Sequence, residues 1–160
     1  MADWIEVGSP APKFTLTATN GGKIRLADLK GTPIVLYFYP KDDTPGCTVE
    51  ACAFRDRSNE LQALGTQVFG ISPDDVESHQ AFTDKYDLNI PLLADTNHAV
   101  AEKYGAWREK NRYGKKFMGI QRSTFIIDGS GNVARVWKAV KVDGHDTKVL
   151  EALEQLVNDD

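Results

Sequence analysis

The chain has 160 residues, of which 41% are hydrophobic and 26% are charged, and its formal net charge is −4. This length suits one domain, which we expect to span residues 1–160. The acidic balance argues against nucleic-acid binding, which usually needs a basic face. The apolar run at residues 34–39 is too short for a bilayer, and residues 1–10 lack a secretory-signal pattern, so we expect a soluble, cytoplasmic protein that binds no membrane.

The first half of the chain predicts a hairpin, a central strand and a helix. Strand-like residues flank Asn20-Gly21-Gly22, which is typical of a β-hairpin. The apolar run "IVLYFY" ends at Pro40 and predicts a strand covered on both faces. A helix is expected over about residues 48–64, followed by a strand at "QVFGIS". Ser72-Pro73, followed by two acids, predicts the start of the next helix.

The second half predicts a further strand at "IPLLAD", a short helix, a second hairpin and a terminal helix. Two strand-like segments flank residues 129–132, and the final apolar positions have helical spacing. Strands that alternate with helices, with a hairpin near each end, indicate an α/β fold with a central mixed sheet. The pattern is compatible with a thioredoxin-like fold that carries an N-terminal β-hairpin.

The only two cysteines, Cys47 and Cys52, lie five residues apart at the start of the first predicted helix. Unpaired N–H groups and the helix dipole at this end favour an anion, and therefore a thiolate at Cys47. Position alone equally allows Cys47 to be a small buried hydrophobic residue. An ideal helix separates the two α-carbons by about 8 to 9 Å. A disulfide requires less than about 7 Å, so an intact helix excludes the bond and its formation requires unwinding. The spacing therefore favours a bond that forms and breaks during a reaction.

The histidines do not complete a metal site at the sequence level. Zinc-binding cysteines usually lie two to four residues apart and need two further ligands. His79 is interpreted as a partly packed surface residue, His98 as the start of a helix, and His145 as a loop residue after a glycine. None of them has metal-like spacing to another, so we expect no metal.

Two segments, "PKDDTPGCTVEAC" at residues 40–52 and "GIQRSTFIID" at residues 119–128, closely resemble the peroxiredoxins. The most similar subfamily is PrxQ, also called bacterioferritin comigratory protein. Its pattern of Pro, Thr and Cys is matched by Pro40, Thr44 and Cys47, its distant arginine by Arg122, and its second cysteine by Cys52. The resemblance runs from about Gly8 to the terminal helix.

The resemblance implies a thiol peroxidase on a thioredoxin-like fold, with Cys47 as the peroxidatic and Cys52 as the resolving residue. Hydrogen peroxide and organic hydroperoxides are the implied substrates, and thioredoxin or a glutaredoxin-like protein is the implied electron donor. No cofactor is implied, and a monomer is expected. Arg122 would stabilise the thiolate and the developing oxyanion, and Thr44 would orient the peroxide.

The remaining site residues have ordinary structural interpretations beside the functional ones. Pro40 ends the strand, and its ring could exclude water above the sulfur. Glu50 could hold an arginine in place, although a surface glutamate is the ordinary interpretation. Threonine next to Pro-Gly is also common in turns, and Arg122 alone would suggest only a salt bridge at the start of a strand.

The sequence leaves three alternatives open. A thioredoxin-like thiol-disulfide reductase would carry Cys-x-x-Cys, which is absent, and a proline where Ser123 stands. A copper-binding protein of thioredoxin-like fold would need a closer cysteine pair and a histidine ligand. A glutathione-peroxidase-like enzyme would use Gln and Trp partners, whereas the three tryptophans are interpreted as packing residues.

Overall fold

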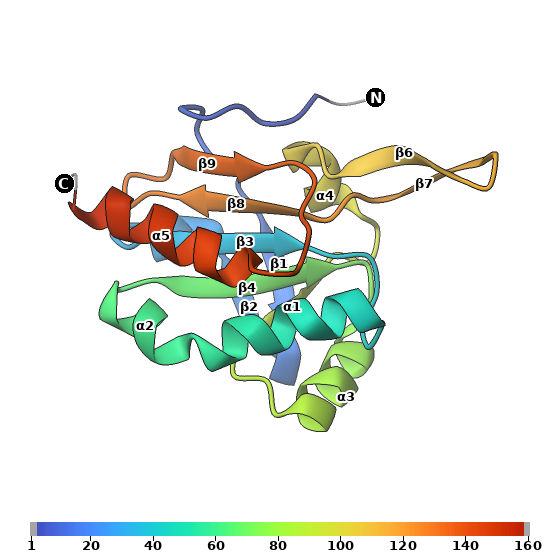
Figure 1. Ribbon diagram of the computed structural model, residues 1–160, viewed down its shortest axis with the longest axis horizontal. Helices are drawn as coiled ribbons and strands as arrows, with labels where there is room; N and C mark the ends of the chain where they lie inside the picture. Colours follow the sequence, from blue (N-terminus) through green and yellow to red (C-terminus); the bar gives the residue numbers. More distant parts are fainter. Residues whose placement is uncertain (1–2, 159–160) are drawn as a thin grey trace.

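The computed structural model describes residues 3–158 as a mixed β-sheet with helices on both faces (Figure 1). Seven strands are arranged in the order β2-β1-β5-β4-β3-β8-β9. They are β1 Thr15–Ala18, β2 Lys23–Arg25, β3 Ile34–Phe38, β4 Gln67–Ser72, β5 Leu92–Ala94, β8 Ser123–Ile127 and β9 Val133–Trp137. Strands β3, β4 and β5 pair in parallel, and the other pairings are antiparallel, which confirms the predicted mixed sheet.

Strand β3 lies inside the sheet, and its side chains alternate between two hydrophobic cores. Leu36 and Phe38 belong to the core on one face, and Val35 and Tyr37 to the core on the other. All five residues of β3 are buried, as the uninterrupted apolar run predicts. A doubly covered strand of this kind gives a rigid support for the loop that follows it.

The helices are divided between the two faces. Residues of α1, α3 and α5 contribute to the core that contains Tyr37, and α4 contributes to the core that contains Phe38. The helices are α1 Pro45–Asp56, α2 Ser58–Ala63, α3 Val76–Tyr86, α4 Ala99–Tyr104 and α5 His145–Asn158, with short 3-10 turns at Thr19–Gly21 and Leu26–Leu29. Among the described residues, no helix combines the length and apolar character needed to cross a bilayer.

Most predicted elements are confirmed, but two helix boundaries are wrong. The single helix expected over residues 48–64 is two helices, α1 and α2, because the backbone of Arg57 leaves the helical region. Helix α3 begins at Val76 and not directly after Pro73, since the Asp75 carboxylate accepts a hydrogen bond from the Ser78 N–H at 2.8 Å and caps the helix. Both predicted hairpins are present, as β1–β2 and β8–β9.

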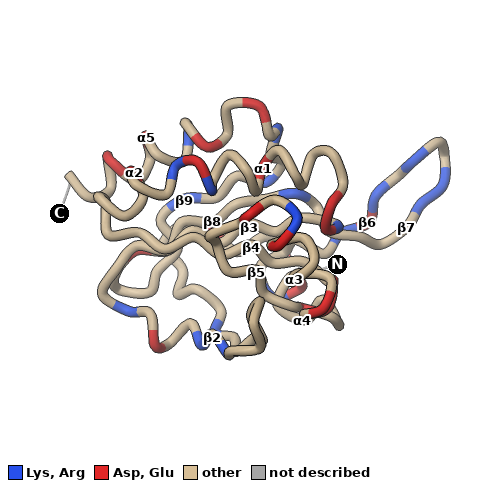
Figure 2. The backbone as a smooth tube through the Cα atoms, turned by 90° about the horizontal axis from the view of Figure 1, so that it is seen from below, with Lys and Arg blue, Asp and Glu red and all other residues tan. Residues whose placement is uncertain are grey.

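An additional hairpin, β6 Trp107–Arg112 and β7 Lys115–Ile120, was not predicted. It projects from the body of the molecule and carries many lysines and arginines (Figure 2). Its two-residue turn, Tyr113-Gly114, has positive φ at both positions, which is the geometry that tight hairpins prefer. Asn-Gly and Asp-Gly are the usual sequence signals for this turn, so the sequence Tyr-Gly does not predict a hairpin here.

Candidate active site

Cys47 lies in the first turn of α1, where the sequence places it. Thr44 is the N-cap residue and Pro45 the first helical residue, whose missing N–H is not needed at that position. Only 1% of Cys47 is exposed, and it packs in the core that contains Tyr37. The sulfur therefore sits at the positive end of a helix dipole and out of bulk water.

Arg122, in the link between β7 and β8, reaches across to the cysteine. Its Nη2 donates a hydrogen bond to the Cys47 Sγ at 3.2 Å, and its Nη1 donates one to the Glu50 Oε1 at 2.8 Å. Gly46 permits this approach, because a Cβ there would lie 3.1 Å from the Arg122 Nη2. One guanidinium thus bridges the cysteine and the glutamate, and it can hold a thiolate by a charge-assisted hydrogen bond.

Glu50 is buried, so its interpretation as a surface glutamate is wrong. Its side chain is 1% exposed, and burial raises the pKa of its carboxyl to about 7 even though Arg122 acts to lower it. The Glu50 Oε2 and the Tyr37 Oη are both buried without a hydrogen-bond partner. Burial also raises the pKa of Tyr37, and the charges of Glu50 and Cys47 raise it further. The sulfur therefore has several polar neighbours in a dry environment.

Thr44 and Pro40 lie on the loop between β3 and α1. The Thr44 hydroxyl does not cap the helix but donates a hydrogen bond to the Lys41 carbonyl at 2.9 Å. The lone pairs of its oxygen can still accept a hydrogen bond. Pro40 is exposed just after the end of β3, and its suggested effect on water near the sulfur stays a prediction.

Cys52 lies on the same helix as Cys47 and is partly exposed, and both cysteines are free thiols. Because α1 is continuous from Pro45 to Asp56, helix geometry keeps the two α-carbons about 8 to 9 Å apart. A bond between the two sulfurs is therefore excluded in this conformation, as the sequence predicts.

Lys110, on the unpredicted hairpin, interacts electrostatically with Arg122 and Cys47. Its Nζ donates to the Ile120 carbonyl at 2.8 Å, close to the residues that lead into Arg122. Burial lowers the pKa of Lys110, and the positive charge of Arg122 lowers it further. No sequence signal ties a lysine on this hairpin to a cysteine more than sixty residues away.

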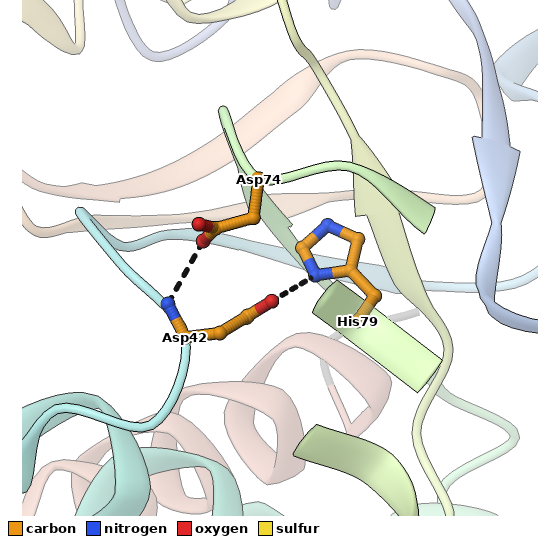
Figure 3. Close-up of side chains that lie close together, drawn as sticks. All are labelled: Asp42, Asp74 and His79. Atoms are coloured by element: carbon orange, nitrogen blue, oxygen red, sulfur yellow. Dashed lines mark hydrogen bonds and ion pairs between the residues drawn. The ribbon is translucent and has the colours of Figure 1, made fainter. Parts of the chain in front are cut away.

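Asp42, Asp74 and His79 form a second polar cluster beside the loop that precedes Cys47 (Figure 3). The interpretation of His79 as a surface residue is wrong, because it is fully buried and lies 2.7 Å from the Asp42 Oδ2 through its Nδ1. One atom from each residue could in principle face a metal, since the three atoms lie within 4.8 Å of one another. The Asp74 carboxylate already accepts from the Asp42 N–H, and both His79 nitrogens already face oxygen acceptors, so the donor set fits a hydrogen-bonded network better than a metal site.

His145 also differs from its expected position in a loop. It is the first residue of α5, and its Nε2 lies 2.8 Å from the Thr124 Oγ1. Burial lowers the pKa of His145 to about 4, so the ring is neutral near pH 7. His98, in contrast, is the N-cap residue of α4, at the start of a helix as expected, although its side chain makes no capping hydrogen bond.

The comparison with protein families identifies residues 7–136 as a match to the AhpC/TSA family. The chain is 45% identical to peroxiredoxin Bcp of Bacillus subtilis, over 95% of this chain and 97% of the other. It is 42% identical to peroxiredoxin Bcp of Escherichia coli, over 94% of this chain and 97% of the other. These relatives cover almost the whole length of the chain.

Solved structures agree with the sequence comparisons. The bacterioferritin comigratory protein of Xanthomonas campestris, studied for its alkyl peroxide reduction activity, superimposes with a TM-score of 0.89 and 36% identity over 95% of this chain and 99% of the other. PrxQ of Xylella fastidiosa gives a TM-score of 0.91 with 30% identity, over 96% and 98%. These likenesses confirm the thioredoxin-like fold. The chain belongs to the AhpC/TSA family as a peroxiredoxin of the Bcp or PrxQ type, and it is a thiol-dependent peroxidase that acts on peroxides at the expense of a thiol reductant.

Proposed function

We propose that Cys47 is the peroxidatic residue, that Cys52 resolves its oxidised form, and that Arg122, Thr44 and Pro40 complete the site. The observation that carries the proposal is the 3.2 Å hydrogen bond from the Arg122 Nη2 to the Cys47 Sγ at the start of a helix. A thiolate is the nucleophile in such chemistry, and an ordinary thiol is only a few per cent ionised at neutral pH. The start of the helix and the guanidinium both place positive electrostatic potential next to this nucleophile.

In the first step, the Cys47 thiolate attacks one peroxide oxygen and the O–O bond breaks. The sulfur becomes a sulfenic acid, and the other oxygen leaves as an alkoxide or hydroxide that takes up a proton to give an alcohol or water. Arg122, which donates a hydrogen bond to the sulfur at 3.2 Å, would stabilise this negative charge, and a fixed donor in such a role is worth about 10²–10³ in rate. Because Cys47 is 1% exposed, the reacting end must be small, as in hydrogen peroxide or a terminal –OOH group.

The Thr44 hydroxyl is suited to orienting the substrate. Since the Thr44 hydroxyl donates its hydrogen to the Lys41 carbonyl, its oxygen is free to accept a hydrogen bond from the O–H of the peroxide. This hydrogen bond would align the O–O bond of the peroxide with the sulfur. Pro40 would act only as a scaffold that limits water near the sulfur.

In the second step, the Cys52 thiol condenses with the sulfenic acid at Cys47, which forms the disulfide and releases water. The helix that holds both residues keeps them too far apart for this bond, so the first turns of α1 must unwind. Partial exposure of Cys52 places its thiol near the surface, where the mixed disulfide with a reductant can form.

A dithiol protein such as thioredoxin, or a glutaredoxin-like protein, would then reduce the disulfide by exchange and restore both thiols. The chain would act as a single-domain monomer, because each step uses residues of one polypeptide. The cytoplasm, which keeps such donors reduced, is the proposed location. The same site does not favour a dithiol reductase, since Cys52 does not face the Cys47 sulfur across one helical turn.

The test is peroxide consumption coupled to thioredoxin, compared between the wild type, Cys47→Ser and Cys52→Ser. We expect Cys47→Ser to lose turnover entirely. Cys52→Ser should consume one equivalent of peroxide rapidly and then stop with thioredoxin, with Cys47 recovered as a sulfenic acid by mass spectrometry. Sustained thioredoxin-dependent turnover in Cys52→Ser, with no linked Cys47–Cys52 peptide in the oxidised wild type, would contradict the assignment.

A further inference from the structure

Two consecutive aspartates connect the loop before Cys47 to helix α3. Asp42 and Asp43 lie between the end of β3 and the start of α1, directly before Thr44. Their carboxylates point to different partners on α3, one buried and one at the surface. The loop that positions Cys47 is therefore attached to α3 at two adjacent residues of unequal burial.

The buried attachment is made by Asp42, whose side chain is 4% exposed. Its carboxylate accepts hydrogen bonds from the Tyr39 hydroxyl at 2.6 Å and the Ser78 hydroxyl at 2.8 Å, and it contacts the His79 Nδ1 at 2.7 Å. Its backbone N–H donates to the Asp74 Oδ2 at 2.8 Å (Figure 3). A carboxylate with this many partners in a dry environment is costly to release, because each partner would be left unpaired.

His79 connects the loop to the sheet, because one of its ring nitrogens contacts Asp42 and the other contacts Leu93 of β5. Its Nε2 lies 3.0 Å from the Leu93 carbonyl, which can only accept, so the Nε2 carries a hydrogen. One further proton must then lie between the His79 Nδ1 and the Asp42 Oδ2. The pair thus forms a proton-bridged link that joins the loop, α3 and the end of β5.

Asp43 makes the surface attachment and has a strained backbone. Its carboxylate accepts from the Lys85 Nζ at 2.7 Å and the Tyr86 hydroxyl at 2.8 Å, and the charged side chains of Asp43 and Lys85 are 39% and 57% exposed. Exposed ion pairs are screened by water and contribute little. The φ of Asp43 is +58°, in the left-handed region that is unfavourable for a residue with a side chain.

We propose that the Asp42–His79 pair is a fixed anchor for the loop before Cys47 and that Asp43 is the hinge at which the unwinding of α1 begins. The inference rests on the proposed function, because it assigns the upstream limit of the unwinding that a Cys47–Cys52 disulfide requires. Release at Asp43 breaks a weak, exposed attachment and relaxes an unfavourable backbone angle. Asp42 stays in place, so Cys47 returns to Arg122 when the disulfide is reduced. Asp42 and His79 are therefore positioning residues and not catalytic ones.

The experiment compares neighbouring variants, Asp42→Ala and Asp43→Ala, by hydrogen exchange of the reduced proteins and by rapid-quench measurement of Cys47 oxidation with hydrogen peroxide. Asp42→Ala should speed exchange of the amides of residues 42–44, 46 and 47 at least tenfold, with the amides of β8 unchanged, and should slow Cys47 oxidation at least tenfold. Asp43→Ala should leave the oxidation rate within twofold of the wild type.

A conservative variant separates anchoring from general destabilisation. Asp42→Asn can restore the link, because its side-chain N–H can donate to a His79 Nδ1 that has given up its proton. We expect oxidation within about threefold of the wild type, and a ¹⁵N resonance of the His79 Nδ1 that moves to the range of an unprotonated nitrogen. This variant also serves if Asp42→Ala does not fold.

The inference is overturned if Asp42→Ala and Asp43→Ala affect exchange and oxidation equally, or if the His79 ring resonances do not respond to Asp42→Asn. Failure of the proposed function gives a different result. In that case no linked Cys47–Cys52 peptide forms in the oxidised wild type, whereas the exchange and resonance measurements on reduced proteins still report on the anchor.

Discussion

Replacement of Arg122 by methionine removes the guanidinium and keeps an unbranched, flexible side chain. The change deletes the 3.2 Å hydrogen bond to the Cys47 Sγ and the 2.8 Å hydrogen bond to the Glu50 Oε1. Loss of one donor aimed at developing charge costs about 3 to 4 kcal/mol, or about 10²–10³ in rate. We therefore expect the second-order rate constant for Cys47 oxidation to fall by about 10²–10³.

The same variant should remain folded, for a reason that concerns Glu50. The pKa of this buried carboxyl is already about 7 with Arg122 present, so the group takes up a proton when the guanidinium is lost and avoids a buried unpaired charge. The free energy of unfolding should decrease by about 1 to 3 kcal/mol at pH 7. Chemical denaturation measures this change separately from the rate.

Arg135→Met is the matched control for the Arg122 variant. The Arg135 guanidinium lies 4.7 Å from the centre of the Trp137 ring on β9, and it makes no contact with the sulfur. Competition between each variant and a peroxidase of known rate constant for limiting hydrogen peroxide gives the oxidation rate. A folded Arg122→Met protein that reacts within threefold of the wild type would refute the role of the guanidinium.

Three further predictions concern residues around the same helix and sheet. Burial raises the pKa of Glu50 from 4.5 to about 7, so between these pH values the folded state holds a proton that the unfolded state loses. The contribution of Glu50 to stability is therefore complete below pH 4.5 and decreases by about 3 kcal/mol as the pH rises through 7. Glu50→Gln should lack this decrease in denaturation measured from pH 4 to 8. Equal pH dependence in both proteins would contradict it. Thr44→Val should lower kcat/KM for peroxide about 10- to 100-fold, with Thr44→Ser close to the wild type, and equal rates for all three would exclude a role for the hydroxyl. Gly70→Ala should lower the free energy of unfolding by about 1 to 3 kcal/mol, because its Cβ would lie 2.7 Å from the Tyr37 ring; an unchanged denaturation midpoint would show that the core adapts.

The sequence predicts the sheet and its strands well because their signals are local. The apolar run of β3 and the turn residues of the β1–β2 and β8–β9 hairpins are visible in short windows. The sequence does not predict the break at Arg57, where the side chain contacts α5 through Asp146 at 2.8 Å and Thr147 at 3.0 Å. Contacts between residues about ninety positions apart leave no local pattern.

The same distinction applies to the site. Cys47 and Thr44 lie in one contiguous motif, and the structure places both at the start of α1 as expected. Arg122 was identified only through the resemblance to a family, because nothing local links it to Cys47. The burial of Glu50 and His79 could not be predicted, since each is a polar residue on a helix whose inward face is set by packing in three dimensions.

The unwinding of α1 when Cys47 and Cys52 bond is the step on which the proposed reaction depends most directly. Hydrogen exchange of residues 44–54, measured by mass spectrometry on the reduced protein and on the protein oxidised by one equivalent of peroxide, tests this step, with Cys52→Ser treated in the same way as the control. We expect the oxidised wild type to lose protection in this segment and the control to keep it. Equal protection of the segment in the reduced and disulfide forms of the wild type would contradict the account.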